Sequence, residues 1–159
     1  MNGIPIDVSQ MKTFEAIKGE DAKDTRLLKE MMIEANSFLS SHEWCDHVDS
    51  LYFAYGVGGI IAIFLAQITP YSSEVDKCLW VIVGDIPAAY IVADDNPTVA
   101  DALDAYCLEM DTWVKAVNEG ESVDDLIPVN VSPTPEYAEQ LRGRLEYIRS
   151  NILPLALAG

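Results

Sequence analysis

The spacing of apolar residues first predicts a helix near the N-terminus. From Lys23 onward, apolar side chains recur at intervals of three and four residues, the period of one helix face, and Ser40-Ser41-His42 ends the pattern. Residues 1–20 show no clear period. We therefore expect a loosely ordered N-terminal arm over residues 1–20 and a single domain over residues 21–159.

The middle of the chain changes to short runs with a β-rich composition. Two such runs, 48–55 and 60–68, are separated by a glycine cluster at 56–59, and glycine permits the positive φ that a tight hairpin turn requires. A third run at 78–83 is connected to a fourth at 89–92 by Gly-Asp-Ile-Pro. Four consecutive strands with short links predict an antiparallel meander.

Two helices are predicted to close the chain. Thr98 and Asp101 have the spacing of a capping box and open an apolar stripe that Gly120 terminates. Thr134 is a candidate N-cap before a proline at the first helical position, and its helical pattern continues to Pro154. The order predicts an α+β fold: a four-stranded antiparallel meander sheet with one N-terminal and two C-terminal helices.

The run Ile60–Ile68 is apolar on both of its alternating faces. An antiparallel strand with one solvated face should instead alternate between apolar and polar residues. Two explanations are open. Helices cover both faces, which we favour, or one face meets a second copy in a homodimer.

Charge is concentrated in the middle of the chain. Residues 43–127 carry 16 Asp and Glu against two bases, Lys77 and Lys115, which gives −14 of the chain's formal −16. Such a charge repels nucleic acid and anionic lipid and attracts basic partners, although it is also a means of keeping a protein soluble. Nucleic-acid and membrane binding are therefore set aside.

Other features bear on the compartment. The N-terminal residues lack the basic and apolar regions of a secretory signal, and the longest apolar run is about half of the roughly 20 residues that a membrane helix needs. Three cysteines are too few and too scattered for a disulfide framework. We expect a reduced, soluble, cytoplasmic protein.

Two groups of side chains have the residue types of metal ligands. His42, Cys45 and His47 are zinc-ligand types, but their spacing matches no zinc signature. Asp94, Asp95, Asp101 and Asp104 lack the spacing of a calcium loop, and acidic residues before a helix are typical of favourable interactions with its dipole. No metal or other cofactor is predicted.

Signatures of catalysis are also missing. The glycine cluster lacks the lysine and the helix of a phosphate-binding loop, and the sequence has no Gly-x-Ser-x-Gly elbow. Arg142, Arg144 and Arg149 are expected to form exposed pairs with nearby glutamates rather than a basic patch. An enzyme is therefore less favoured than a binding protein, and no catalytic residue is assigned.

One motif resembles a known group of sequences. Trp80 begins a strand that leads into Gly84-Asp85-Ile86-Pro87 and then Tyr90, and Trp44-Cys45 lies upstream. This arrangement resembles small bacterial proteins of an uncharacterised domain family, over about residues 44–115. The resemblance implies a bacterial cytosolic protein and no particular activity.

The leading hypothesis is a non-enzymatic acidic module that binds a basic protein, for example an inhibitor of the immunity type for a toxin nuclease. Its candidate partner-binding residues are Asp85, Asp94, Asp95, Asp101 and Asp104. The alternative is a small-molecule-binding or enzymatic domain with an aromatic pocket between sheet and helices, lined by Tyr52, Tyr55, Trp80, Tyr90 and Trp113. A homodimeric structural subunit, formed through Ile60–Ile68, is a third reading.

Overall fold

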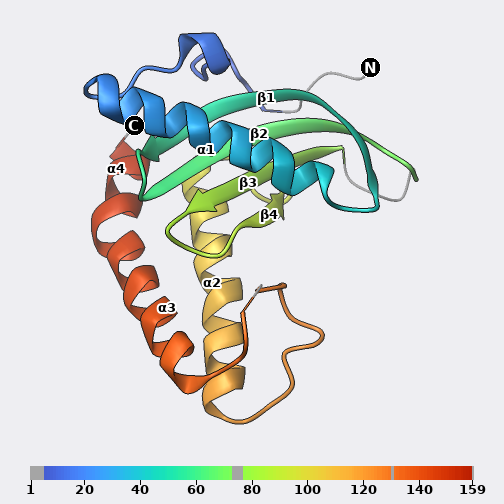
Figure 1. Cartoon of the computed structure of the whole chain (residues 1–159), viewed down its shortest axis with the longest axis vertical. Helices are drawn as coiled ribbons and strands as arrows, with labels where there is room; N and C mark the ends of the chain where they lie inside the picture. The colour runs from blue at the N-terminus through green and yellow to red at the C-terminus, as the bar shows by residue number, and fades with distance from the viewer. Residues whose placement is uncertain (1–5, 73–76, 130, 159) are drawn as a thin grey trace. The chain divides into compact units, whose positions relative to one another are not determined.

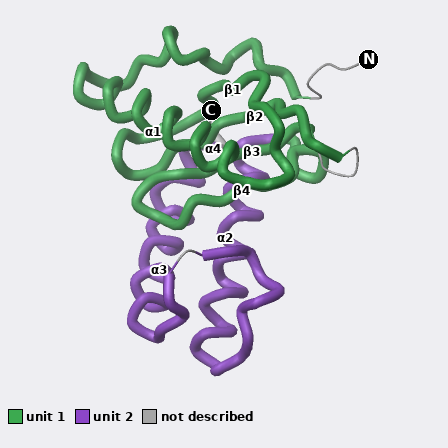
Figure 2. The backbone as a smooth tube through the Cα atoms, turned by 45° about the vertical axis from the view of Figure 1, so that its right-hand side comes forward, with its two compact units in different colours: residues 1–97 green, residues 98–159 purple. Residues whose placement is uncertain are grey.

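The computed structural model describes residues 6–72, 77–129 and 131–158. The chain divides into two compact units, residues 1–97 and residues 98–159 (Figure 2). The single domain expected over residues 21–159 stays a prediction.

Unit 1 contains a four-stranded antiparallel sheet and a helix (Figure 1). The strands are connected in sequence order as a meander, β1-β2-β3-β4, as the sequence predicts. Their bounds, with those of the helices before them, are η1 Phe14–Ala16, α1 Ala22–Ser40, β1 Cys45–Val57, β2 Ile61–Pro70, β3 Cys78–Gly84 and β4 Ala89–Val92.

Helix α1 packs on one face of this sheet through the apolar stripe that the sequence shows. Asp21 is the N-cap, and its carboxylate accepts a hydrogen bond from the Asp24 amide at 2.8 Å. Residues of α1 and the α1-facing positions of the strands form one buried cluster: Leu28, Met31, Met32, Ala35, Leu39, Ala62, Phe64, Ala66, Ile68, Leu79, Val81 and Val83, together with Ile17 and Cys45.

The central strand β2 explains why both faces of residues 60–68 are apolar. Hydrogen-bonded neighbours flank β2 on both edges, and residues 61–66 have no exposed surface within the single chain. Phe64 belongs to the α1-facing cluster, whereas its neighbours Ile63 and Leu65 point to the opposite face. Residues 61–66 are thus buried in the single chain, and the homodimer stays a prediction.

Two turns at one end of the sheet are held together by the backbone of Ile60. The amide of Asp85 donates to the Ile60 carbonyl at 3.0 Å. Gly84, which directly precedes Asp85, has φ +147°, and a Cβ at this position would collide with the carbonyl oxygen of Ile60. The Gly-Asp-Ile-Pro link needs glycine at its first position because of this close approach.

Residues 6–20 precede α1, and residues 1–5 of the expected arm lie outside the described residues. Lys12 forms two backbone hydrogen bonds with Phe53 of β1, at 3.0 and 2.7 Å, and Ile17 is buried in the α1-facing cluster. The part of the arm that the structure describes is thus attached at two points.

Unit 2 consists of helices. They are α2 Val99–Asn118, α3 Pro135–Tyr147, a π-helical turn η2 Ile148–Ile152, and α4 Leu153–Ala158. Thr98 and Thr134 cap α2 and α3 as predicted, each accepting from the amide three residues later. The packed helix faces are apolar and include Tyr106 and Trp113 of α2 and Leu141 and Leu145 of α3.

The expected end of the last helix at Pro154 is wrong, because helical backbone continues to Ala158. The amide of Leu153 bonds to the Ile148 carbonyl, five residues earlier, which is the pattern of a π-turn. Proline has no amide proton, and its ring crowds the carbonyl four residues before it. The widened turn directly before Pro154 gives the ring room, so the helix passes through the proline.

Candidate functional site

The carboxylates of residues 43–127 lie at the surface. Of the 14 that the structure describes, 13 are exposed and Asp111 is half-buried. The exposed ones are Glu43, Asp46, Asp49, Asp85, Asp94, Asp95, Asp101, Asp104, Glu109, Glu119, Glu121, Asp124 and Asp125. The charge of this segment is therefore available to a partner.

Three of the five predicted partner-binding residues belong to unit 1. Asp85 lies in the turn between β3 and β4, and Asp94 and Asp95 lie in the turn that follows β4. The second turn is fixed from inside, because the indole Nε1–H of buried Trp80 donates to the Asn96 carbonyl at 2.6 Å. The Asn96 side chain in turn donates to the Val92 carbonyl at 3.0 Å. The sequence motif thus sets the position of two exposed carboxylates.

The other two, Asp101 and Asp104, belong to the first turns of α2 in unit 2. They are three residues apart and therefore neighbours on one helix face. Asp101 occupies the position whose amide donates to the Thr98 hydroxyl at 3.1 Å, and its carboxylate also favours the positive end of the helix dipole. Asp85 lies at one end of β4 and Asp94 and Asp95 at its other end, so the five predicted residues fall into three separate places: Asp85, the pair Asp94 and Asp95, and the pair Asp101 and Asp104.

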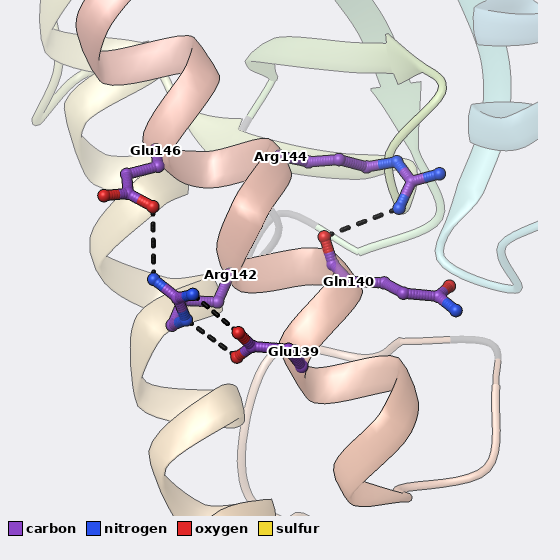
Figure 3. Close-up of polar contacts among 5 residues, drawn as sticks. All are labelled: Glu139, Gln140, Arg142, Arg144 and Glu146. Carbon is purple, nitrogen blue, oxygen red and sulfur yellow. Dashed lines mark hydrogen bonds and ion pairs between the residues drawn. The ribbon is translucent and has the colours of Figure 1, made fainter.

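The arginines of unit 2 are largely engaged with acids of the same unit. Arg142 of α3 pairs with Glu139 at 2.6 Å and with Glu146 at 3.1 Å, as Figure 3 shows, and these exposed pairs confirm the sequence prediction for Arg142. Arg144 donates to the Gln140 backbone carbonyl at 3.4 Å. Arg149 reaches Asp111 of α2 at 2.5 Å, and this hydrogen bond raises the pKa of the guanidinium.

The predicted pocket residues fall on different surfaces. Cross-strand pairing places Tyr52, Tyr55 and Trp80 on the sheet face opposite to α1, because Tyr52 pairs with Leu65 and Leu65 with Trp80, while Tyr55 pairs with Ile63. Tyr90 pairs with Val81 and packs against the α1-facing cluster instead. Trp113 is buried in unit 2, with its ring 5.9 Å from that of Tyr137.

An aromatic cluster that the sequence analysis missed lies where α1 ends. The ring of His42 is 4.8 Å from Phe38, 4.7 Å from Trp44 and 5.5 Å from Tyr90, between centroids, and Trp44 is 5.0 Å from Tyr90. His42 Nδ1 is 2.7 Å from the Phe38 carbonyl oxygen. All four rings are half-buried. The spacing of Phe38 and His42, one helical turn apart, could have indicated that these two rings are neighbours. The contact with Tyr90 could not be predicted in this way, because Tyr90 is remote in sequence.

The zinc-type residues of the same segment point in different directions. His42 is stacked among aromatic rings, Cys45 is buried in the α1-facing cluster, and the exposed His47 ring lies 4.0 Å from Asp49. Burial raises the pKa of the Cys45 thiol, with Asp46 adding to the effect. Among the described residues, no group of three or more His, Cys, Asp or Glu is placed to hold a metal ion.

Comparisons with models of protein families, with curated proteins and with solved structures give no significant match. Within the described parts of the chain, no helix has both the length and the apolar character required to cross a membrane.

Proposed function

We propose that this chain is a non-enzymatic acidic module that binds a basic protein. The observation that carries this proposal is the exposure of 13 of the 14 described carboxylates between residues 43 and 127, against only Lys77 and Lys115 in the same segment. Both lysines are exposed. A surface of one charge sign raises the rate of encounter with a partner of opposite sign and disfavours partners of like sign.

A basic nuclease inhibited by an immunity-type protein is one concrete form of such a pair. Enzymes that bind nucleic acid carry positive surfaces that contact phosphates. Surface carboxylates carry the same sign of charge as the phosphates. The same charge makes nucleic acid itself an unfavourable ligand of this chain.

We further propose that the chain binds its partner as a monomer. Residues 61–66, the centre of the stretch considered for a dimer, are fully buried within one chain. A sedimentation mass equal to the 17.5 kDa of the chain is the expected result. Twice that mass would restore the homodimer.

Affinity capture tests the proposed function. The tagged full chain is incubated with lysate of the source organism, washed at low salt and eluted with a salt gradient, and eluted proteins are identified by mass spectrometry. A single basic protein, released in stoichiometric amount at elevated salt, is expected. A matched bait with the same tag and six carboxylates changed to amides (Asp85, Asp94, Asp95, Asp101, Asp104 and Glu109) should retain little of it. Equal capture by both baits would contradict a charge-driven interaction.

A further inference from the structure

We propose that the aromatic patch of unit 1, formed by Phe38, His42, Trp44 and Tyr90, is the surface on which an arginine-bearing segment of the basic partner docks. This inference rests on the proposed function and deepens it, because it assigns the contact to one surface and to one side-chain type. Its basis is the combination of half-buried aromatic rings with carboxylates, within two stretches of the sequence (residues 30–76 and 78–114) that carry no lysine or arginine.

The patch has the composition of an interface centre. Its rings come from the end of α1, from the connection to β1 and from β4, and Trp44 and Tyr90 meet edge to face at an interplanar angle of 70°. Each of the four residues is half-buried, and Phe38, Trp44 and Tyr90 pack against the buried α1-facing cluster. Tryptophan and tyrosine are the aromatic residues most enriched at energetically important interface positions.

Trp44 differs in this respect from the other two tryptophans. Trp80 and Trp113 are 0 % and 1 % exposed, as expected for large apolar side chains in a core. Trp44 is only half-buried, but its neighbours fix its position. Its carbonyl accepts the Tyr71 amide at 3.0 Å, and its ring is fixed between His42 and Tyr90. A ring that is already fixed loses little conformational entropy when a partner binds.

Carboxylates accompany the rings. Glu43 lies between His42 and Trp44 in sequence, and Glu34 lies one helical turn before Phe38 on α1; both are exposed. Partial burial raises the pKa of Glu34, and a nearby cation would offset the loss of hydration that causes this shift. Asp46 accepts a hydrogen bond from the side chain of Tyr71, next to Trp44, which raises the pKa of the tyrosine.

The patch residues lie in stretches of the sequence without lysine or arginine, and the bases of α1 (Lys23, Arg26 and Lys29) belong to the first half of that helix. The sequence contains no lysine or arginine from residue 30 to residue 76, nor from residue 78 to residue 114. Arginine fits this surface better than lysine, because its planar guanidinium stacks on aromatic rings while its N–H groups reach carboxylates. A partner that offers an arginine can therefore use the rings and the carboxylates together.

Titration of the ¹⁵N-labelled full chain with octa-arginine tests this assignment, with the three indole N–H signals as the readout and Trp44→Phe to identify the signal of Trp44. A saturable shift of the Trp44 signal is expected, while the Trp113 signal stays in place. Octa-lysine, with the same charge, should bind about threefold more weakly, because it lacks a planar group to stack on the rings.

The location is tested by two double variants that remove the same charge. Glu34→Gln with Glu43→Gln alters the patch, and Glu119→Gln with Glu121→Gln alters exposed acids of unit 2 as the matched control. The patch variant should weaken octa-arginine binding about fivefold and the control less than twofold. Binding with an unmoved Trp44 signal, or equal weakening by both variants, would overturn the assignment and leave the proposed function standing. No binding to either peptide at low salt would overturn the proposed function itself.

Discussion

Asp24 connects helix α1 to the β1–β2 turn, and its removal should destabilise unit 1 measurably. One carboxylate oxygen accepts the Gly58 amide at 2.7 Å, in a half-buried position, and the other accepts the exposed Glu20 amide at 2.9 Å. Losing a charge-assisted bond to a half-buried amide costs about 1.5–2 kcal/mol, and losing the exposed one about 0.5–1 kcal/mol. Asp24→Ala should therefore lower the free energy of unfolding by about 2–3 kcal/mol.

Urea unfolding followed by circular dichroism measures this loss, and hydrogen exchange of the Gly58 amide shows where it arises. Asp21→Ala is the matched control: it removes only the cap to the Asp24 amide and should cost about 1 kcal/mol. In Asp24→Ala the Gly58 amide should exchange faster, whereas in Asp21→Ala it should stay protected. If Asp24→Ala were no more destabilising than Asp21→Ala, the link between helix and turn would contribute nothing, and the reasoning would be refuted.

Three further predictions concern the backbone and the buried thiols. Gly84→Ala should lower the free energy of unfolding in urea by more than about 2 kcal/mol, because φ is positive at this position and an added Cβ would collide with the neighbouring turn. Gly143→Ala, which has open space around it on α3, should instead raise the free energy of unfolding by about 0.5–1 kcal/mol. Similar effects of the two substitutions would refute the role of the close approach at Gly84. Burial raises the pKa of Cys78 and Cys107 from 9.0 to about 11. Because the folded-state pKa is above the unfolded value, the resulting stability is present below pH 9.0 and is lost as the pH rises toward 11. The melting temperature should therefore fall across this interval, and it should fall less in a variant with both cysteines changed to alanine. Pro154→Ala restores an amide donor within a helical segment and should raise the unfolding free energy by about 0.5–1 kcal/mol. A loss of stability would show that the preceding π-turn does not serve to accommodate the proline.

Local patterns were sufficient to predict the elements and their order. The meander followed from four β-rich runs with short links, and both predicted caps, Thr98 and Thr134, start helices in the structure. Such features depend on neighbours within a few residues, where period and turn chemistry are readable. Boundaries were less accurate: β1 begins at Cys45 rather than Val48, and it carries three register irregularities that no period reveals.

The assignment of side chains to faces could not be made in the same way. Tyr90 was grouped with Trp80, but Trp80 pairs with Ile91 and Tyr90 with Val81, so the two rings lie on opposite faces. A shift of one residue in the link between β3 and β4 would have reversed this result. The contact of Tyr90 with Trp44 is equally beyond local patterns, because α1 and its connection bring together residues that are 46 positions apart.

The salt dependence of partner association tests the central claim most directly. The association rate constant of the full chain with its captured basic partner is measured by stopped-flow fluorescence at about 0.05 M and about 0.5 M sodium chloride, over which the screening length falls about threefold. Steering by the exposed carboxylates predicts a rate at least about tenfold lower at the higher salt concentration. A rate that does not change with salt would contradict the account, because the acidic surface would then have no part in recognition.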